Sequence, residues 1–176
     1  MKKIAGISTS SSSKSINREI LSNALNKVGN GNTTLIDLNQ NIPIYSIDIE
    51  EKHGIPDEIQ ELFTKLQSYD AYIITVPEHN GSVTALFKNN LDWLSRIDQN
   101  IFGKKDVLLI STSPGPNGGK YALAHVKSFI PFLGGNVVSD FSLGSFYDNY
   151  QNESLTDKKI NTDFVEALNI FKTVLV

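Results

Sequence analysis

Residues 71–83 read AYIITVPEHNGSV, and this stretch changes character halfway along. Its first half is a nearly continuous apolar run, of the kind found in strands that are buried on both faces of a parallel sheet. The run then ends in proline, asparagine and glycine, which restrict or bend the backbone and favour a turn. The stretch therefore predicts a buried strand at 71–76 followed by a loop at 77–83.

Strands and helices alternate in the same order on both sides of this stretch. Further strands are expected at 2–8, 33–38 and 106–111, with a short fifth strand around Val137, Val138 and Phe141. Helices are expected at 15–28, from Pro56 to Leu66, up to about residue 96, at 120–133 and at 156–174, and a loop is expected up to Ile55. This alternation indicates a parallel sheet with right-handed crossovers. It predicts one flavodoxin-like domain over residues 1–176, a three-layer α/β/α sandwich with five parallel strands in the order 2-1-3-4-5.

Composition excludes several classes of protein. The 176 residues include 40% apolar and 20% charged side chains, which is typical of a globular domain, and the net charge of −3 argues against a nucleic-acid or membrane-surface binder. Without cysteine the chain has no disulfide, thiolate nucleophile or Cys-ligated metal, and the spacing of its three histidines matches no metal motif. The start, MKKIAGISTS, is expected to be a strand rather than a signal peptide, and no apolar run reaches transmembrane length. We expect a cytoplasmic protein.

Three unusual loops follow strands 1, 3 and 4 of the expected sheet. They are STSSSSKSIN (8–17), PEHNGS (77–82) and SPGPNGG (113–119). In the order 2-1-3-4-5 these loops share the carboxyl edge, next to the point between strands 1 and 3 where the connections change direction. A ligand crevice is therefore expected there.

The serine-rich loop admits several interpretations as an anion site. It lacks both glycines of a Walker-type loop and the three glycines of a Rossmann fingerprint, so neither nucleotide-binding motif fits. A third interpretation is a pocket for a phosphate monoester, lined by hydroxyl groups and by the backbone N–H groups of a helix N-terminus, with Asn17 adding a side-chain donor. The alternative is that the serines only cap the helix and line a solvated loop.

The other two loops favour close contact with a flat ligand. Glycine lets the backbone approach a heterocycle, and free amides in 113–119 would stabilise negative charge on a bound ring. Glu78 and His79 could be read as an acid/base pair, but adjacency in sequence does not place their side chains together. The alternative for 113–119 is a glycine-rich turn that caps the next helix.

With these loops in view, the chain resembles the NAD(P)H-dependent FMN reductase family, which also contains quinone, chromate and azo-dye reductases. The resemblance is carried by TSSSSKSIN (9–17), PEHNGSVTALFKNNLDWLSR (77–96) and SPGPNGGKYA (113–122), with further likeness in IDLNQNIPIYSIDIE (36–50). The chain departs from the family pattern at Ser12, where the family has arginine, and at His79, where it has tyrosine.

The resemblance implies a set of cofactor-binding residues. Around the FMN phosphate it places Ser10, Ser12, Ser15, Ile16 and Asn17; along the isoalloxazine ring Pro77, Glu78, His79, Asn80 and Gly81; and near the other side of the ring Ser113, Gly115 and Gly118. Lys88, Asn89, Asp92 and Trp93 match the helix motif and are interpreted as structural or subunit-contact residues.

The implied activity is transfer of electrons from NADPH or NADH through FMN to a quinone, free flavin, azo compound or similar small acceptor. The flavin carries the chemistry, so no catalytic residue is expected. No metal site is expected either, because the chain lacks cysteine and its histidine spacing matches no metal motif. The resemblance also implies a homodimer or homotetramer. Two alternatives stay open: a non-catalytic FMN-binding electron carrier, to which a net charge of −3 gives little support, and a binding module that has lost the flavin.

Overall fold

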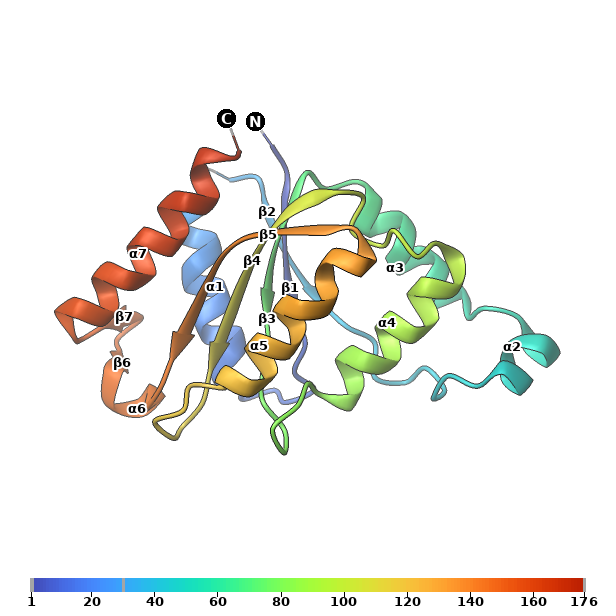
Figure 1. Ribbon diagram of the computed structural model, residues 1–176, viewed down its shortest axis with the longest axis horizontal. Coiled ribbons are helices and arrows are strands. Elements are labelled where there is room, and N and C mark those ends of the chain that lie inside the picture. Colours follow the sequence, from blue (N-terminus) through green and yellow to red (C-terminus); the bar gives the residue numbers. More distant parts are fainter. Residues whose placement is uncertain (1, 30, 176) are drawn as a thin grey trace.

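The computed structural model describes residues 2–29 and 31–175 and is built around a five-stranded parallel sheet. The strands are β1 (Ile4–Ser8), β2 (Thr33–Asp37), β3 (Ala71–Thr75), β4 (Lys105–Thr112) and β5 (Gly135–Leu143). Their order is β2-β1-β3-β4-β5, which confirms the predicted flavodoxin-like topology (Figure 1).

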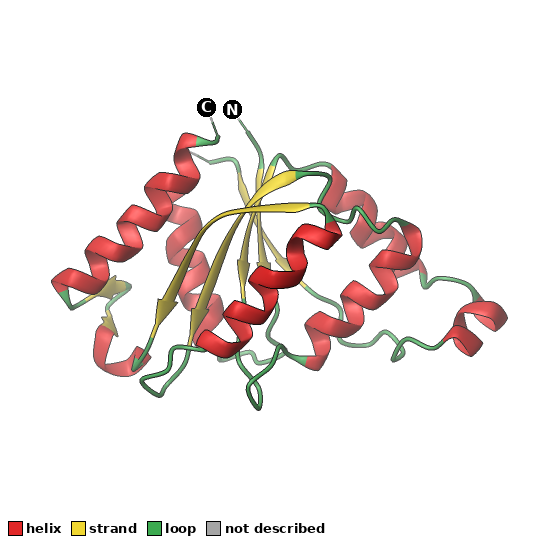
Figure 2. Cartoon of the chain, viewed as in Figure 1, coloured by secondary structure: helices red, strands yellow, loops and turns green. Residues whose placement is uncertain are grey.

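Helices cover both faces of this sheet and complete the predicted sandwich (Figure 2). The α-helices are α1 (Ile16–Val28), α2 (Ile47–His53), α3 (Asp57–Gln67), α4 (Ala85–Ile97), α5 (Lys120–Phe129), α6 (Phe146–Asn149) and α7 (Lys158–Thr173). Helices α1 and α7 pack on one face, and α3, α4 and α5 pack on the other. All three layers are therefore present.

Strand β3 lies at the centre and shows why the apolar run is uninterrupted. Every residue of β3 is buried, because successive side chains face opposite helix layers. Ala71 and Ile73 belong to the core beneath α1 and α7, whereas Tyr72 and Ile74 belong to the core beneath α3, α4 and α5. A strand covered on both sides needs apolar residues at every position.

The structure differs from the sequence-based expectations in several segments. The expected loop up to Ile55 contains α2, which Ser46 caps and Gly54 ends at φ 76°, and which buries no residue. The helix expected at 120–133 is α5 followed by a 3-10 turn, η1 (Ile130–Leu133), where Pro131 lacks the N–H that an α-helix would need. The fifth strand is nine residues long rather than short. Between it and α7 lie α6 and a hairpin of β6 (Tyr150–Gln151) and β7 (Ser154–Leu155), which were not predicted.

Residues 43–54, here called the arm, extend from the body and include α2 (Figure 1). Helix α4 holds the arm through Asn89, which donates to Pro43 O at 3.0 Å and accepts from Tyr45 N at 2.8 Å. Trp93 Nε1 also donates to Pro43 O, at 2.9 Å. Asn89 and Trp93, which the sequence analysis interpreted as structural or subunit-contact residues, thus hold the arm against α4.

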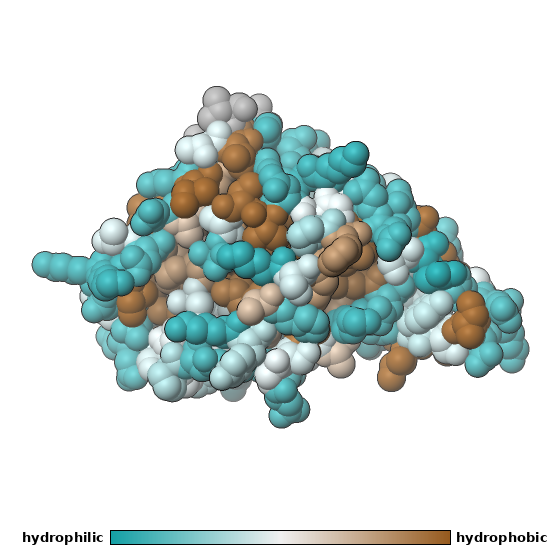
Figure 3. Space-filling view, in the orientation of Figure 1, coloured by the Kyte–Doolittle hydropathy of each residue, from teal (hydrophilic) through white to brown (hydrophobic). Residues whose placement is uncertain are grey.

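Two apolar side chains of the arm face solvent. Ile44 is 81% exposed and Ile47 is 51% exposed, and Figure 3 shows apolar surface at the end of the molecule where α2 lies.

Within residues 2–29 and 31–175, no helix has the length and apolar character needed to cross a bilayer.

Candidate functional site

The three loops predicted to form a site follow β1, β3 and β4 and share the carboxyl edge of the sheet, at the bottom of Figure 1. Buried hydroxyl groups join the first loop to the residues on either side of the second loop. Thr9 Oγ1 donates to Thr75 O at 2.7 Å, and Thr84 Oγ1 donates to Thr9 O at 2.7 Å. Thr84 also caps α4 by accepting from Phe87 N at 3.1 Å. Because these bonds are buried, the first two loops have a fixed relative position.

A buried asparagine joins the first helix to the end of β4. Asn17 Nδ2 donates to Thr112 O at 2.9 Å, and Asn17 Oδ1 accepts from Thr112 N at 3.1 Å. The side chain of Asn17 was expected to donate to a phosphate, but the structure uses it to pair with backbone. Asn17 lies in the first turn of α1, where main-chain N–H groups have no partner within the helix, so its main-chain N–H can still donate to a ligand.

The serine-rich loop turns back on itself through its own side chains. Ser10 Oγ accepts from Ser12 N and Ser12 Oγ accepts from Lys14 N, both at 3.2 Å, while Ser15 caps α1 by accepting from Arg18 N. Such serine turns expose backbone N–H groups and leave each hydroxyl hydrogen free to donate. Among the described residues, no acceptor bonds the N–H of Ile16.

Arginine is present beside this loop, although it is already paired. Arg18 lies in the first turn of α1 and forms an ion pair with Asp37 at the end of β2. The hydrogen bond to Asp37 raises the pKa of the Arg18 guanidinium, and burial opposes this effect in part. Lys14 is exposed in the loop. The loop itself, residues 8–17, contains no acidic residue.

The second loop forms a tight turn that projects from the edge. His79 and Ser82 pair through their backbones, with His79 N to Ser82 O at 2.9 Å, around Asn80 at φ 52° and Gly81 at φ 75°. These positive angles explain the Asn-Gly pair, because both residues tolerate left-handed backbone. The side chains of His79 and Asn80 are exposed, and Pro77 is buried at the base of the turn.

The predicted site residues of the third loop differ in exposure: Gly115 is exposed, whereas Gly118 is buried. Ser113 Oγ donates to Gly115 O at 2.9 Å, and Gly115 is exposed with open space where a side chain would stand. Gly118 is buried at φ 65°, and a Cβ there would overlap Ser142 Oγ. Gly115 can therefore face a ligand directly, whereas Gly118 packs against β5.

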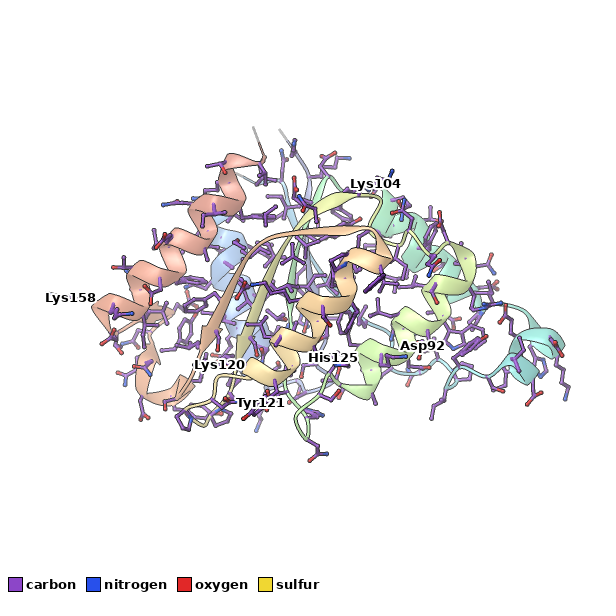
Figure 4. All side chains as sticks on the ribbon, in the orientation of Figure 1. Asp92, Lys104, Lys120, Tyr121, His125 and Lys158 are labelled. Atoms are coloured by element: carbon purple, nitrogen blue, oxygen red, sulfur yellow. The ribbon has the colours of Figure 1, made fainter. Side chains whose placement is uncertain are left out.

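Glu78, in the second loop, directs its carboxylate toward the start of α5. Its Oε2 accepts from Tyr121 N at 2.9 Å and from Ala122 N at 3.2 Å, at the start of α5. Figure 4 labels Tyr121 there, at the lower edge of the molecule. The carboxylate therefore contacts backbone amides rather than the imidazole of His79.

The structure thus brings all three predicted loops together, but their connecting residues were not predicted. Sequence reasoning missed Thr9, Thr84, Ser111 and Thr112, which are buried and hydrogen-bonded across the edge. For Thr9, Ser111 and Thr112 the available signal was a hydroxyl residue directly after an apolar run, as in ISTS (7–10) and LLISTS (108–113). Among the residues that the structure describes, no group of three His, Asp or Glu side chains could hold a metal.

Comparison with known proteins identifies a matching family. Residues 2–148 match the sequence model described as NADPH-dependent FMN reductase. The chain is 33% identical over 98 residues to a quinone reductase of Escherichia coli, an alignment that covers 56% of this chain and 52% of that protein. The chain thus spans about half the length of this relative.

A second relative and a solved structure extend the comparison. An NAD(P)H-dependent FMN reductase of Pseudomonas aeruginosa is 30% identical over 131 residues, which cover 74% of this chain and 70% of that protein. The solved structure of a flavoenzyme NAD(P)H:(acceptor) oxidoreductase from Paracoccus denitrificans superimposes with a TM-score of 0.75 over 98% of each chain, at 24% identity. This structural likeness supports the fold.

Proposed function

Because the chain belongs to the NADPH-dependent FMN reductase family, as its motifs predicted, we propose that it is an NAD(P)H-dependent flavin oxidoreductase. It binds FMN at the carboxyl edge of the sheet and passes electrons from NADPH or NADH to a small acceptor. Quinones, free flavins and azo compounds are the acceptor classes that we propose. Residues 1–176 form one FMN-binding domain in this proposal.

The observation that carries the proposal is the chemistry of the first loop, which suits a phosphate monoester. Exposed serine hydroxyls and the N–H groups of the first turn of α1 supply donors, and residues 8–17 include no carboxylate that would repel a dianion. Lys14 adds positive charge nearby. Ser12 can donate one hydrogen bond where the family arginine would donate several, so we expect weaker phosphate binding than an arginine would give.

The ring of the flavin would lie along the second and third loops. The turn at Asn80 and Gly81 and the open backbone at Gly115 both present main-chain groups at the edge. Bound FMN would supply hydride acceptance and electron transfer, and the protein would bind and orient it and shape its surroundings. No side chain of the site is assigned a proton-transfer role in this proposal.

We also propose that the enzyme is a cytoplasmic homodimer or homotetramer. Helices α4 and α5 border a groove of about 290 Å³ that Leu91, Phe129 and Phe132 line, and Phe132 is 76% exposed. Asp92 and His125 mark its two sides in Figure 4. Exposed apolar residues there and on the arm support association between copies. Sedimentation of the purified protein tests this part of the proposal.

The binding test compares FMN affinity in a matched pair of variants. Ser12→Asp places a carboxylate in the proposed phosphate loop, and repulsion of a dianion in water costs on the order of 1–2 kcal/mol, so the dissociation constant should rise roughly tenfold. Thr64→Asp adds the same charge at an exposed position of α3 and should leave the affinity unchanged. Titration of the flavin fluorescence measures both. Equal effects of the two substitutions would contradict the proposed phosphate site.

The catalytic test follows oxidation of NADPH and of NADH by the FMN-loaded protein with a benzoquinone as acceptor. Turnover that requires added or bound FMN supports the oxidoreductase. Retention of FMN without turnover would favour the non-catalytic electron carrier, and absence of FMN binding would favour the module that has lost its flavin.

A further inference from the structure

Glu78 connects two loops through contacts that a proton-transfer residue would not need. One carboxylate oxygen, Oε2, accepts from both Tyr121 N and Ala122 N, at 2.9 and 3.2 Å. The other oxygen accepts from Asn117 Nδ2 at 3.5 Å. The three donors all belong to the third loop and the start of α5, whereas Glu78 belongs to the second loop. The carboxylate therefore bridges two segments that are separate in the chain.

Ser111, in β4, forms a second link nearby. Ser111 Oγ is within 2.8 Å of Val76 O and within 3.2 Å of Gly119 O, and the side chain is fully buried. Gly119 adopts φ 73°, and a Cβ there would overlap Ser111 Oγ. The backbone of the third loop thus approaches Ser111 of β4 so closely that only glycine fits at position 119.

From these contacts we propose that Glu78 is a positioning residue that holds the second loop against the start of α5 and so sets the spacing of the two loops beside the flavin ring. This inference rests on the proposed function. Its consequence is that the first amides of α5 are already satisfied by a carboxylate, so they are not an anion site for a cofactor or substrate.

The hydrogen-bond geometry favours this role over acid/base chemistry. An oxygen that accepts from two amides is held in place by charge-assisted bonds, which are stronger than neutral ones. The positive end of the α5 dipole further stabilises the negative carboxylate. A residue that delivers protons to a substrate would have an oxygen free to reach it, whereas both oxygens of Glu78 face donors of the protein.

The test uses three variants of the full chain. Glu78→Ala removes the bridge, Glu78→Gln keeps an oxygen that can accept from the amides, and Glu61→Ala removes an exposed carboxylate of α3 as a control. Amide hydrogen exchange at Tyr121 and Ala122, measured by NMR without FMN, reports the bridge itself. FMN affinity and the pH profile of anaerobic flavin reduction by NADPH report its effect on the site.

We expect Glu78→Ala to accelerate exchange at both amides at least about tenfold and to weaken FMN binding about tenfold or more. Glu78→Gln should restore most of the protection and bring FMN affinity to within about threefold of the original protein, with an unchanged pH profile. Glu61→Ala should change none of these quantities.

Several results would overturn the inference. Unchanged exchange in Glu78→Ala would show that the bridge does not protect the amides, and unchanged FMN affinity would show that it does not position the site. Loss of flavin reduction in Glu78→Gln with affinity retained would instead assign the carboxyl group to proton transfer. If the original protein binds no FMN, the proposed function fails, and with it the positioning role, whereas protection at Tyr121 and Ala122 would still establish the bridge.

Discussion

Replacing Asn17 with alanine removes the two hydrogen bonds that join α1 to the end of β4. Both bonds are buried, at 2.9 Å to Thr112 O and 3.1 Å from Thr112 N, and the asparagine is 4% exposed. Alanine keeps the helix but leaves the N–H and C=O of Thr112 without this partner. The substitution therefore tests whether the end of β4 depends on a residue of the first loop region.

The expected loss of stability follows from these two bonds. Each hydrogen bond contributes about 1 kcal/mol net, and a buried backbone group left without a partner costs about 1–3 kcal/mol. Since water can reach part of the gap that alanine leaves, we expect a total loss of about 2–4 kcal/mol. For a chain of 176 residues each kcal/mol lowers Tm by about 2–4 °C, so Tm should fall by roughly 4–16 °C.

Urea unfolding of the FMN-free protein, followed by the fluorescence of Trp93, measures this change. Asn26→Ala is the matched control, since Asn26 is exposed on the same helix, and it should shift stability by no more than about 0.5 kcal/mol. The reasoning is refuted if Asn17→Ala loses less than about 1 kcal/mol. A loss of FMN affinity with unchanged stability would show instead that the side chain donates to the phosphate, as the sequence first indicated.

Four further substitutions, one of them a control, test other parts of the structure. Gly119→Ala forces a Cβ into Ser111 at a positive φ and should cost at least about 2 kcal/mol in urea unfolding, whereas Gly115→Ala, which meets open space, should be nearly neutral. The hydrogen bond from Arg96 lowers the pKa of Glu50, so this pair stabilises the fold above the unfolded pKa of about 4.3 and its contribution is lost as pH falls through the lower folded value. Urea midpoints of Glu50→Gln should therefore fall less steeply than those of the original protein between about pH 5 and pH 3. Trp93→Phe keeps the buried ring but loses the bond to the arm, and limited proteolysis should cut the arm faster while the core stays intact.

Much of the fold could be predicted because the sequence pattern of each helix or strand lies within that element itself. The uninterrupted apolar run of β3 and the helical spacing of apolar residues in α1 specify buried elements within a few residues of themselves. Alternation of such elements then restricts the topology to few choices. Helix α2 was missed for the same reason, since it buries no residue and so carries no apolar stripe.

The site could be predicted as a meeting of loops but not as a set of contacts. Glu78 bonds a residue 43 positions away, and Asn17 bonds one 95 positions away, and nothing in either neighbourhood specifies the distant partner. Asn17 was expected to donate to a phosphate from the first helical turn, and the family resemblance placed Glu78 along the flavin ring. The fold instead uses both side chains to join strands and loops, which only the assembled structure can reveal.

The most direct test of the proposed function is anaerobic mixing of the FMN-loaded protein with NADPH and, separately, with NADH. We predict that the visible absorption band of the bound flavin bleaches with at least one of the two nucleotides, at a rate no slower than turnover with a quinone, and returns when the quinone is added. A flavin that stays oxidised, or that is reduced no faster than free FMN, would contradict the account.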